Sequence, residues 1–153
     1  MADSINVTAS PALLTSVPAE AIKHDHQAYS ILHWGFTALP VIAGIDKFTN
    51  ALCDWAMYLA PQFGQFLGPR TTMHAVGIIE IVAGLGVALK PRLFAPVVAC
   101  WLWGIIVNLL LLGGHFDIAL RDFGLSLGAL GLFRLSQHFD VRRKIAGTEP
   151  DRH

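Results

Sequence analysis

Charged residues are scarce in this chain. They make up 14% of its 153 residues, whereas an average soluble domain carries roughly 25%. Neither sign is in excess, because 11 Lys and Arg residues balance 11 Asp and Glu residues. No basic block of the nucleic-acid-binding type is present, so the composition excludes nucleic acid as a partner. Hydrophobic residues supply 54% of the chain, and this excess beside so little charge favours a membrane protein of one domain.

Cysteine and recognisable catalytic motifs are also scarce. Cys53 and Cys100 are the only cysteines, and their spacing fits neither a metal site nor a redox pair. The chain lacks the HExxH zinc motif, the P-loop and the nucleotide-binding glycine fingerprint. Its opening, MADSINVTASPALLTSVPAE, lacks the basic start and apolar core of a signal peptide. We expect this stretch to belong to a flexible arm.

Long apolar segments are what the chain does have. They cover residues 29–48, 72–89, 93–113 and 118–135, and each is close to the ~20 residues that cross a bilayer as a helix. The turns between the last three are short, so these consecutive helices are expected to pack antiparallel. The sequence therefore predicts an all-α membrane protein built as a four-transmembrane-helix antiparallel bundle.

The basic residues predict the orientation of this bundle. Lys23 precedes the first segment, Lys90 and Arg92 lie between the second and third, and a basic group follows the fourth at 134–144. These groups fall on one side of the predicted bundle, and the positive-inside rule places that side in the cytoplasm. Both termini are then cytoplasmic. The predicted parts are a flexible cytoplasmic arm, the transmembrane domain and a basic cytoplasmic tail, over residues 1–26, 27–138 and 139–153.

The outer loop between the first two segments is rich in aromatic residues suited to the headgroup level. These residues are Trp55, Tyr58, Phe63 and Phe66. Residues 51–60 are predicted to form a short interfacial helix that Pro61 ends. The loop either anchors the bundle or forms a lid over an outward-facing pocket.

Glu80 lies near the middle of the second segment. A carboxylate at such depth is costly unless it faces protein or water, which makes it a functional candidate. Lys47 and Arg121 are the expected partners of Glu80. Their combination is either a buried ion-pair network that fixes helix register or a proton-carrying or headgroup-binding site reached from outside.

Polar and small residues recur at steps of three and four in every segment, which places them on one helical face. Small residues let helices approach closely in lipid, so the polar face is also the predicted packing face. The members of these faces are His33, Thr37, Pro40, Gly44 and Lys47; Gly77, Glu80 and Gly84; Trp101, Gly104, Asn108 and His115; Asp117, Arg121, Gly124, Gly128 and Gly131.

Histidines raise the alternative of a haem or a divalent metal. His74 and His115 are predicted near the outer surface, with Asp46 and Asp117 at similar height. A bis-histidine haem needs imidazoles that face each other across the bundle, and spacing alone does not establish this. We therefore assign no metal ligands.

Stretches of three segments resemble the DoxX-like membrane proteins: AGIDKF, GIIEIVAGLGVAL and RDFGLSLGALGLF. The resemblance implies that Gly44 and Lys47 match the family's glycine-lysine element, Glu80 its second-helix acid and Asp122 its late polar position. It departs at His33, where relatives often carry an arginine. The family is typically a four-helix protein of the bacterial inner membrane. Some members are subunits linked to thiosulfate oxidation with quinone as acceptor, or partners of oxidative-stress enzymes.

These observations predict an integral membrane subunit of DoxX type. We expect it to be redox-associated and to bind a quinone or similar amphiphile in a polar bundle interior, with a redox enzyme or a second copy as partner. The candidate catalytic residues are Glu80 as proton relay, Lys47 and Arg121. The candidate cofactor-binding residues are His33, His74, Trp101, Asn108 and Asp122. A solute or proton transport subunit and a non-catalytic scaffold are the alternatives, and the sequence leaves open whether the chain is an enzyme.

Overall fold

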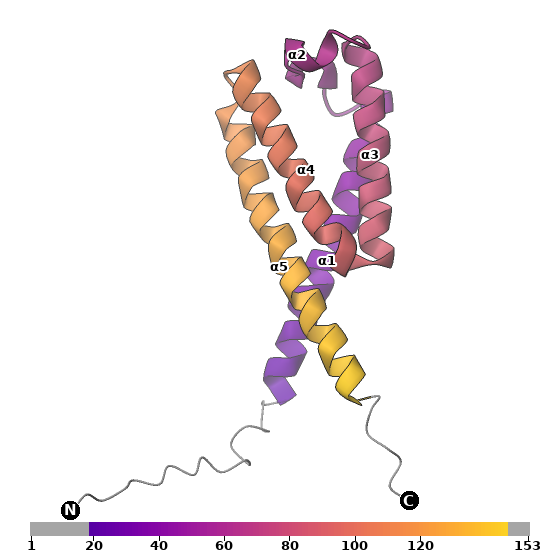
Figure 1. Cartoon of the computed structure of the whole chain (residues 1–153), viewed down its shortest axis with the longest axis vertical. Coiled ribbons are helices and arrows are strands. Elements are labelled where there is room, and N and C mark those ends of the chain that lie inside the picture. The colour runs from indigo at the N-terminus through magenta and orange to yellow at the C-terminus, as the bar shows by residue number, and fades with distance from the viewer. Residues whose placement is uncertain (1–18, 147–153) are drawn as a thin grey trace, which may run out of the picture.

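The computed structural model describes the backbone of residues 19–146 and the side chains of residues 23–139 (Figure 1). Within these residues the chain is all-helical and has no strand. The elements in chain order are α1 (Ala19–Thr49), η2 (Trp55–Tyr58), α2 (Pro61–Gly64), α3 (Pro69–Leu89), α4 (Pro91–Leu112) and α5 (Phe116–Ala146). The predicted all-α class is therefore confirmed.

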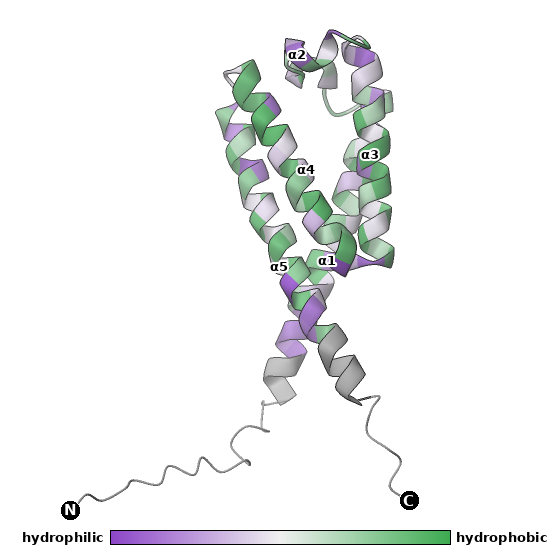
Figure 2. Ribbon diagram, in the orientation of Figure 1, coloured by the Kyte–Doolittle hydropathy of each residue, from purple (hydrophilic) through white to green (hydrophobic). Residues whose placement is uncertain are grey.

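Three helices are long and apolar enough to cross a membrane: Lys23–Thr49 within α1, α3 and α4. Large apolar side chains are exposed on the outward faces of these helices, for example Ile78, Val82 and Leu85 on α3. Figure 2 shows hydrophobic residues around the upper parts of the long helices. Exposed apolar area of this extent suits contact with lipid, so the chain is a membrane protein. Helix α5 is equally long, but Asp117, Arg121 and Asp122 occupy its first two turns.

The long helices form two pairs. Helix α1 packs along α3, and α4 packs along α5. The pairs meet near the tight α3–α4 turn and diverge toward the end that carries η2 and α2 (Figure 1). Where they meet, side chains from all four long helices form a buried core, which consists of Phe36, Ala83, Val87, Ala95, Val98, Ala99, Ala129 and Leu132.

Glycine sets the approach of α1 to α3. A Cβ atom built on Gly84 would lie 2.8 Å from the Thr37 carbonyl oxygen and 2.8 Å from the Val41 side chain. Only a residue without a side chain allows this contact. Gly44 and Gly77 face each other in the same way, about two helical turns closer to the outer loop. The small-residue faces predicted for the first two segments are thus the faces that pack.

The helices extend beyond the predicted spans. Helix α1 already begins at Ala19, and α5 continues to Ala146, so helix enters both the predicted arm and the predicted tail. The rest of those segments, 1–18 and 147–153, lies outside the described residues.

The outer loop differs from its prediction. Residues 51–60 do not form one helix that Pro61 ends; instead a 3-10 turn covers Trp55–Tyr58, and Pro61 begins α2. Asp54 caps the 3-10 turn by accepting a 3.1 Å hydrogen bond from the Ala56 N–H. Proline is favoured at the first position of a helix, where its missing N–H costs nothing, and this is the role that the prediction overlooked.

Candidate functional site

A buried ion pair joins the two helices of the first pair. Lys47 Nζ, near the end of α1, lies 2.6 Å from Glu80 Oε2 in the middle of α3. The two side chains are only 5% and 8% exposed. Glu80 is thus paired with one of its two expected partners. Removing either charge would leave the other buried without its direct partner.

The outer loop covers this pair. The Trp55 ring lies over the Lys47 ammonium, 3.7 Å from ring centroid to Nζ, a cation–π contact that suits a desolvated cation. Trp55 is held there because its Nε1 donates a 2.6 Å hydrogen bond to Asp46 Oδ2. The loop is therefore more than a headgroup anchor, since one of its aromatic residues contacts the site directly.

Asp46 organises the start of the loop, a role that the sequence analysis missed. Its carboxylate accepts hydrogen bonds from the backbone N–H groups of Ala51 at 2.9 Å and Leu52 at 3.1 Å, besides the bond from Trp55. An Asp in the last turn of a helix often bonds to the backbone that follows it. That local pattern is the signal that could have identified Asp46.

Trp101 of α4 brings a buried donor to the same place. Its indole N–H interacts with the Glu80 carboxylate as a weak hydrogen-bond donor. No acceptor within the described part of the chain, Glu80 included, reaches full hydrogen-bond geometry with the buried Nε1. Buried polar atoms almost always have partners, so this poorly satisfied donor calls for an explanation.

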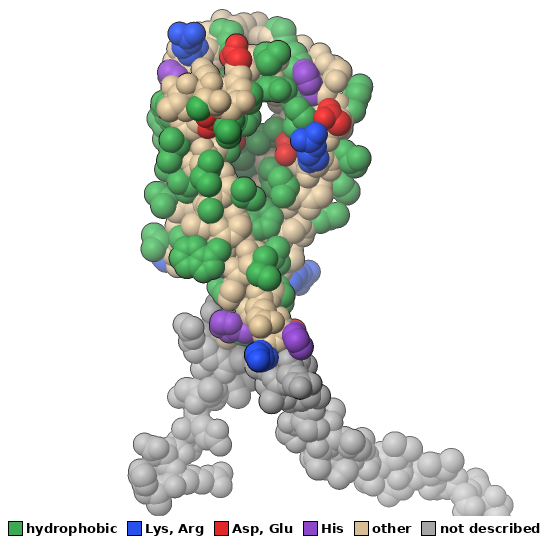
Figure 3. Space-filling view, turned by 180° about the vertical axis from the view of Figure 1, so that it is seen from behind, with side chains coloured by type: hydrophobic (Ala, Val, Ile, Leu, Met, Phe, Trp, Pro, Cys, Tyr) green, Lys and Arg blue, Asp and Glu red, His purple; other side chains and the backbone are tan. Residues whose placement is uncertain are grey.

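Asp122 of α5 completes the arrangement. Its half-buried carboxyl group interacts electrostatically with both Glu80 and Lys47. Each long helix thus contributes one residue to a group that we call the charged centre, defined as Lys47, Glu80, Trp101 and Asp122. One ammonium here faces two carboxyl groups. Seen from behind, the upper half of the molecule is hollowed between the two helix pairs, with acidic side chains beside the recess (Figure 3).

Arg121 does not belong to the charged centre. It pairs instead with Asp117, 3.1 Å away on the same helix, and the two side chains are 73% and 66% exposed. The expected contact between Arg121 and Glu80 is therefore wrong. The packing face predicted for the fourth segment is wrong except at Gly128, where a Cβ atom would lie 3.1 Å from the Phe36 ring of α1. The buried residues of α5 include Ser126, Ala129 and Leu132. The prediction missed the buried face because a shift of one residue along a helix turns the side-chain direction by about 100°. Arg121 needs no charge partner on another helix, because Asp117, four residues earlier on α5, supplies one.

Asn108 holds the outer loop rather than lining the charged centre. Its Oδ1 accepts a 2.9 Å hydrogen bond from the Ala60 N–H, and its Nδ2 donates a 2.6 Å hydrogen bond to the Tyr58 carbonyl. Both contacts tie the segment between η2 and α2 to α4. This amide thereby anchors the outer loop to α4.

The histidines lie apart from one another. His33 Nε2 is 3.1 Å from the Val87 carbonyl oxygen, and fourteen residues of helix, about 20 Å, separate His33 from Lys47. His74 stacks on Phe48 with 4.9 Å between ring centroids, whereas His115 contacts the edge of Tyr58. Among the side chains of residues 23–139 no group of three or more His, Cys, Asp or Glu residues is arranged to hold a metal ion.

Comparisons with protein-family models, with curated proteins and with solved structures find no match to this chain. The chemistry of the charged centre therefore follows from its geometry. It offers N–H donors from Lys47 and Trp101, proton-accepting groups from Glu80 and Asp122, and apolar surroundings. Such a set fits a small amphiphile that presents a hydrogen-bond acceptor to the indole.

Proposed function

We propose that this protein is an integral membrane subunit of DoxX type that binds a quinone, or a similar amphiphile with a carbonyl group, at the charged centre. The observation that carries the proposal is the buried Trp101 N–H, which interacts with the buried Glu80 carboxylate but reaches full hydrogen-bond geometry with no acceptor among the described residues. A ligand carbonyl would supply a better-placed acceptor. A buried donor without any hydrogen bond costs about 1–3 kcal/mol, the contact with Glu80 offsets part of this cost, and ligand binding would recover the remainder.

The neighbouring groups suit quinone chemistry. The Lys47 ammonium polarises a carbonyl oxygen that lies near it, and the Glu80 and Asp122 carboxyl groups accept or deliver a proton at the quinone oxygens. Reduction of a quinone also needs two electrons, which no residue of this chain provides. A redox enzyme bound to the subunit would supply them, which is the sense in which we propose a redox-associated subunit.

The proposal includes four membrane crossings in an antiparallel bundle. Helix α5 is the fourth, because it packs along α4 and exposes Leu120, Leu127 and Leu130 outward. The α3–α4 turn, which contains Lys90 and Arg92, lies on the side of the molecule toward which α1 begins and α5 ends, and both of these helices extend beyond it (Figure 1). The positive-inside rule places this end in the cytoplasm of a bacterial inner membrane. The loop with η2 and α2 then lies at the outer surface.

A quinone titration tests the proposal. The protein is purified in detergent, its native quinone content is measured after solvent extraction, and tryptophan fluorescence is followed while a short-chain ubiquinone is added. Trp101→Phe removes the indole N–H donor and keeps an aromatic ring at this position. It should weaken binding about tenfold, the value of one hydrogen bond of about 1.4 kcal/mol.

Trp103→Phe is the matched control. Trp103 lies on the same helix but is 49% exposed on the outward side, so its replacement should leave the affinity unchanged. Absence of any quinone in the extract together with no saturable quenching would refute the proposal. Equal weakening in both variants would place the quinone outside the charged centre.

A non-catalytic scaffold is the second candidate, because the Lys47–Glu80 pair by itself ties α1 to α3. A scaffold needs the pair only for stability, so a variant that replaces both charges with apolar residues, Lys47→Met with Glu80→Leu, would retain partner binding. The same variant would lose quinone binding if the charged centre is a site. The two measurements on one variant therefore separate the candidates.

A further inference from the structure

A recess opens between the two helix pairs on the face of the molecule that Figure 3 shows. Figure 1 draws α1 behind α3, so this rear face lies on the α1 side of the first pair. Lys47 and Glu80 are buried, whereas Asp122 is only half-buried. Acidic side chains lie beside the recess in Figure 3. The charged centre therefore borders the recess through Asp122.

The first wall of the recess is a stripe along one face of α1, where side chains recur at steps of four and three residues. Its members are Phe36, Pro40, Ala43 and Lys47. The lower end of this stripe is turned toward α5, because a Cβ atom on Gly128 would lie 3.1 Å from the Phe36 ring. The upper end reaches the charged centre at Lys47, eleven residues or about 16 Å further along the helix. Pro40 and Ala43 lie between these ends and are half-buried.

The second wall is a stripe on α5. Gly128, Leu125 and Asp122 recur at steps of three residues, which places them on one side of the helix. Gly128 meets α1, Asp122 belongs to the charged centre, and Leu125 lies between them with 41% of its surface exposed. We call the space between the α1 stripe and the α5 stripe the lateral recess. Its walls are apolar from the contact at Gly128 up to the charged centre.

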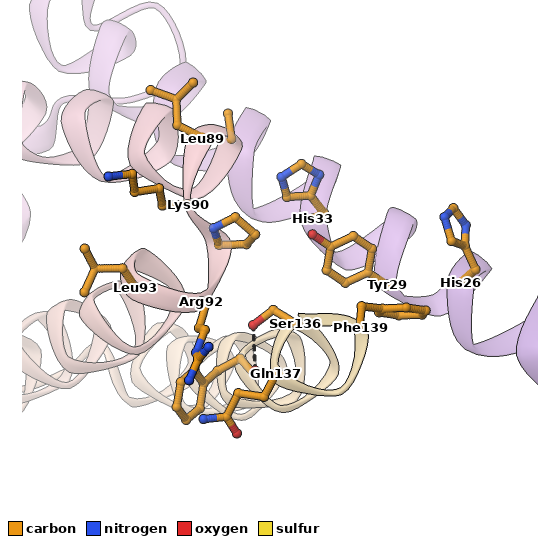
Figure 4. A pocket seen from close by; sticks show the side chains of 13 residues that line it. His26, Tyr29, His33, Leu89, Lys90, Arg92, Leu93, Ser136, Gln137 and Phe139 are labelled. Carbon is orange, nitrogen blue, oxygen red and sulfur yellow. Dashed lines mark hydrogen bonds between the residues drawn. The ribbon is translucent and has the colours of Figure 1, made fainter. Parts of the chain in front are cut away.

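The approaches to the charged centre along the bundle axis are occupied. Toward the cytoplasmic end the buried core fills the space, and its members Val87 and Leu132 are fully buried. A separate cavity of about 1050 Å³ lies beyond that core, with walls from α1, the α3–α4 turn and α5 (Figure 4). Toward the outer end the Trp55 ring lies over the Lys47 ammonium. A ligand of the charged centre therefore approaches from the side of the bundle.

The mouth of the lateral recess lies at the depth of the membrane. The stripe from Phe36 to Lys47 falls within the candidate span Lys23–Thr49 of α1. Leu39 and Ile42, next to this stripe, are each 55% exposed. Acyl chains rather than water meet such a mouth, and a water-soluble ligand would lose its hydration on the way in. The recess therefore favours a molecule with a polar head and an apolar chain.

We infer that the charged centre takes its ligand sideways from the bilayer, and that the lateral recess holds an alkyl or isoprenoid chain of this ligand. The polar head contacts the charged centre, while the chain lies between Ala43 and Leu125 and leaves through the apolar mouth. The inference rests on the proposed function and narrows its ligand to a long-chain, lipid-soluble quinone. Ala43 and Leu125 are then the residues that select for the chain.

Two quinones that share one ring test this inference. Decylubiquinone and the same ring without a chain are titrated into the full chain in detergent, and each concentration is counted within the micelles so that partition into detergent cancels. Decylubiquinone should bind about tenfold more tightly, because close-packed walls contact the chain more fully than a fluid micelle does. Ala43→Phe fills the recess and should abolish this advantage, while binding of the chainless ring stays unchanged. Ala38→Phe is the control, because Ala38 is exposed on the same helix.

A photolabel locates the chain in the unaltered protein, so this second measurement does not depend on how a variant folds. The probe is decylubiquinone with a diazirine group in its alkyl chain. Labelled residues are identified by mass spectrometry with and without an excess of decylubiquinone, because only labelling at a specific site is suppressed by the excess. The suppressed labelling should fall within residues 36–43 of α1 and 122–128 of α5.

The outcomes separate this inference from the proposed function. Equal affinity for the two quinones, or equal loss of decylubiquinone binding in Ala43→Phe and Ala38→Phe, would overturn the inference and leave the proposed function standing. Suppressed labelling at residues 50–68 would show entry through the outer loop, and suppressed labelling at Tyr29 or Phe139 would place the chain in the cavity of Figure 4. Either result would also overturn the inference. Failure of both quinones to bind would refute the proposed function and the inference with it.

Discussion

The backbones of Gly44 and Gly77 are in direct contact where α1 crosses α3. A Cβ atom on Gly44 would lie 2.5 Å from the Gly77 carbonyl oxygen, and one on Gly77 would lie 2.6 Å from the Gly44 carbonyl oxygen. The Lys47 Cβ is also 3.1 Å from that position on Gly77. This contact sets the spacing between the two helices, and the Lys47–Glu80 ion pair forms one turn away from it.

Gly77→Ala should therefore destabilise the protein. The obstructing atom is a backbone oxygen, which cannot rotate away, so the helices must separate at a cost of about 1–3 kcal/mol. Thermal unfolding of the purified protein in detergent, followed by circular dichroism, measures the effect. Gly124→Ala is the control, because a Cβ there meets nothing within 4 Å. An unchanged unfolding temperature for Gly77→Ala would contradict the close contact.

Glu80→Gln should cost more than any change in the exposed pair on α5. It removes the direct partner of the buried Lys47 ammonium and leaves only the more distant Asp122 carboxyl group nearby, and breaking a buried pair typically destabilises a protein by about 3–5 kcal/mol. Lys47→Met with Glu80→Leu should recover much of the loss, because neither member of the pair then remains as a buried charge. The unfolding free energies of the two single variants and the double variant give the coupling directly.

Arg121→Gln serves as the contrast to Glu80→Gln. Its ion pair with Asp117 is exposed to solvent or headgroups, and exposed pairs contribute little. We expect no measurable change in stability and no change in quinone affinity. A large loss on Arg121→Gln would restore the original expectation that this arginine serves the charged centre.

Asn108→Leu should loosen the outer loop while the helices stay folded. The substitution keeps the approximate shape of the side chain but removes the acceptor of the Ala60 N–H and the donor to the Tyr58 carbonyl. Limited proteolysis between residues 50 and 68 should become faster, since each orphaned buried group costs about 1–3 kcal/mol. Gln62→Leu, on the exposed side of α2, is the control and should leave the cleavage rate unchanged.

Cys53 offers a direct test of orientation. It lies in the outer loop, and burial raises the pKa of its thiol. A raised pKa leaves less thiolate at neutral pH, so labelling by a membrane-impermeant maleimide should be slow at pH 7 and accelerate as the pH rises toward 9. In intact cells that express the Cys100→Ala variant, Cys53 should be labelled, whereas Cys53→Ala should remain unlabelled. Labelling only after the cells are broken would reverse the proposed orientation.

The predicted site residues differ in whether the partner of each charge lies nearby in the sequence or on another helix. Lys47 was predicted as a partner of Glu80 because Glu80 is an isolated charge within a long apolar run, and an isolated charge in lipid needs a counter-charge. Arg121 carries the same kind of signal but has an acid four residues before it. A local partner and a distant partner satisfy the same requirement, so the sequence does not decide between them.

The sequence by itself determined the helices, their apolar faces and the small-residue contact between α1 and α3, because these depend on the period of a helix and on the cost of polar groups in lipid. The tertiary structure alone decided which face of α5 is buried, that the Trp101 N–H lies beside the Glu80 carboxylate, and that side chains of α1, α5 and the α3–α4 turn line one open cavity. Those features depend on how far each helix rotates about its axis and on which helices diverge. Packing among distant segments sets both, and no local pattern encodes it.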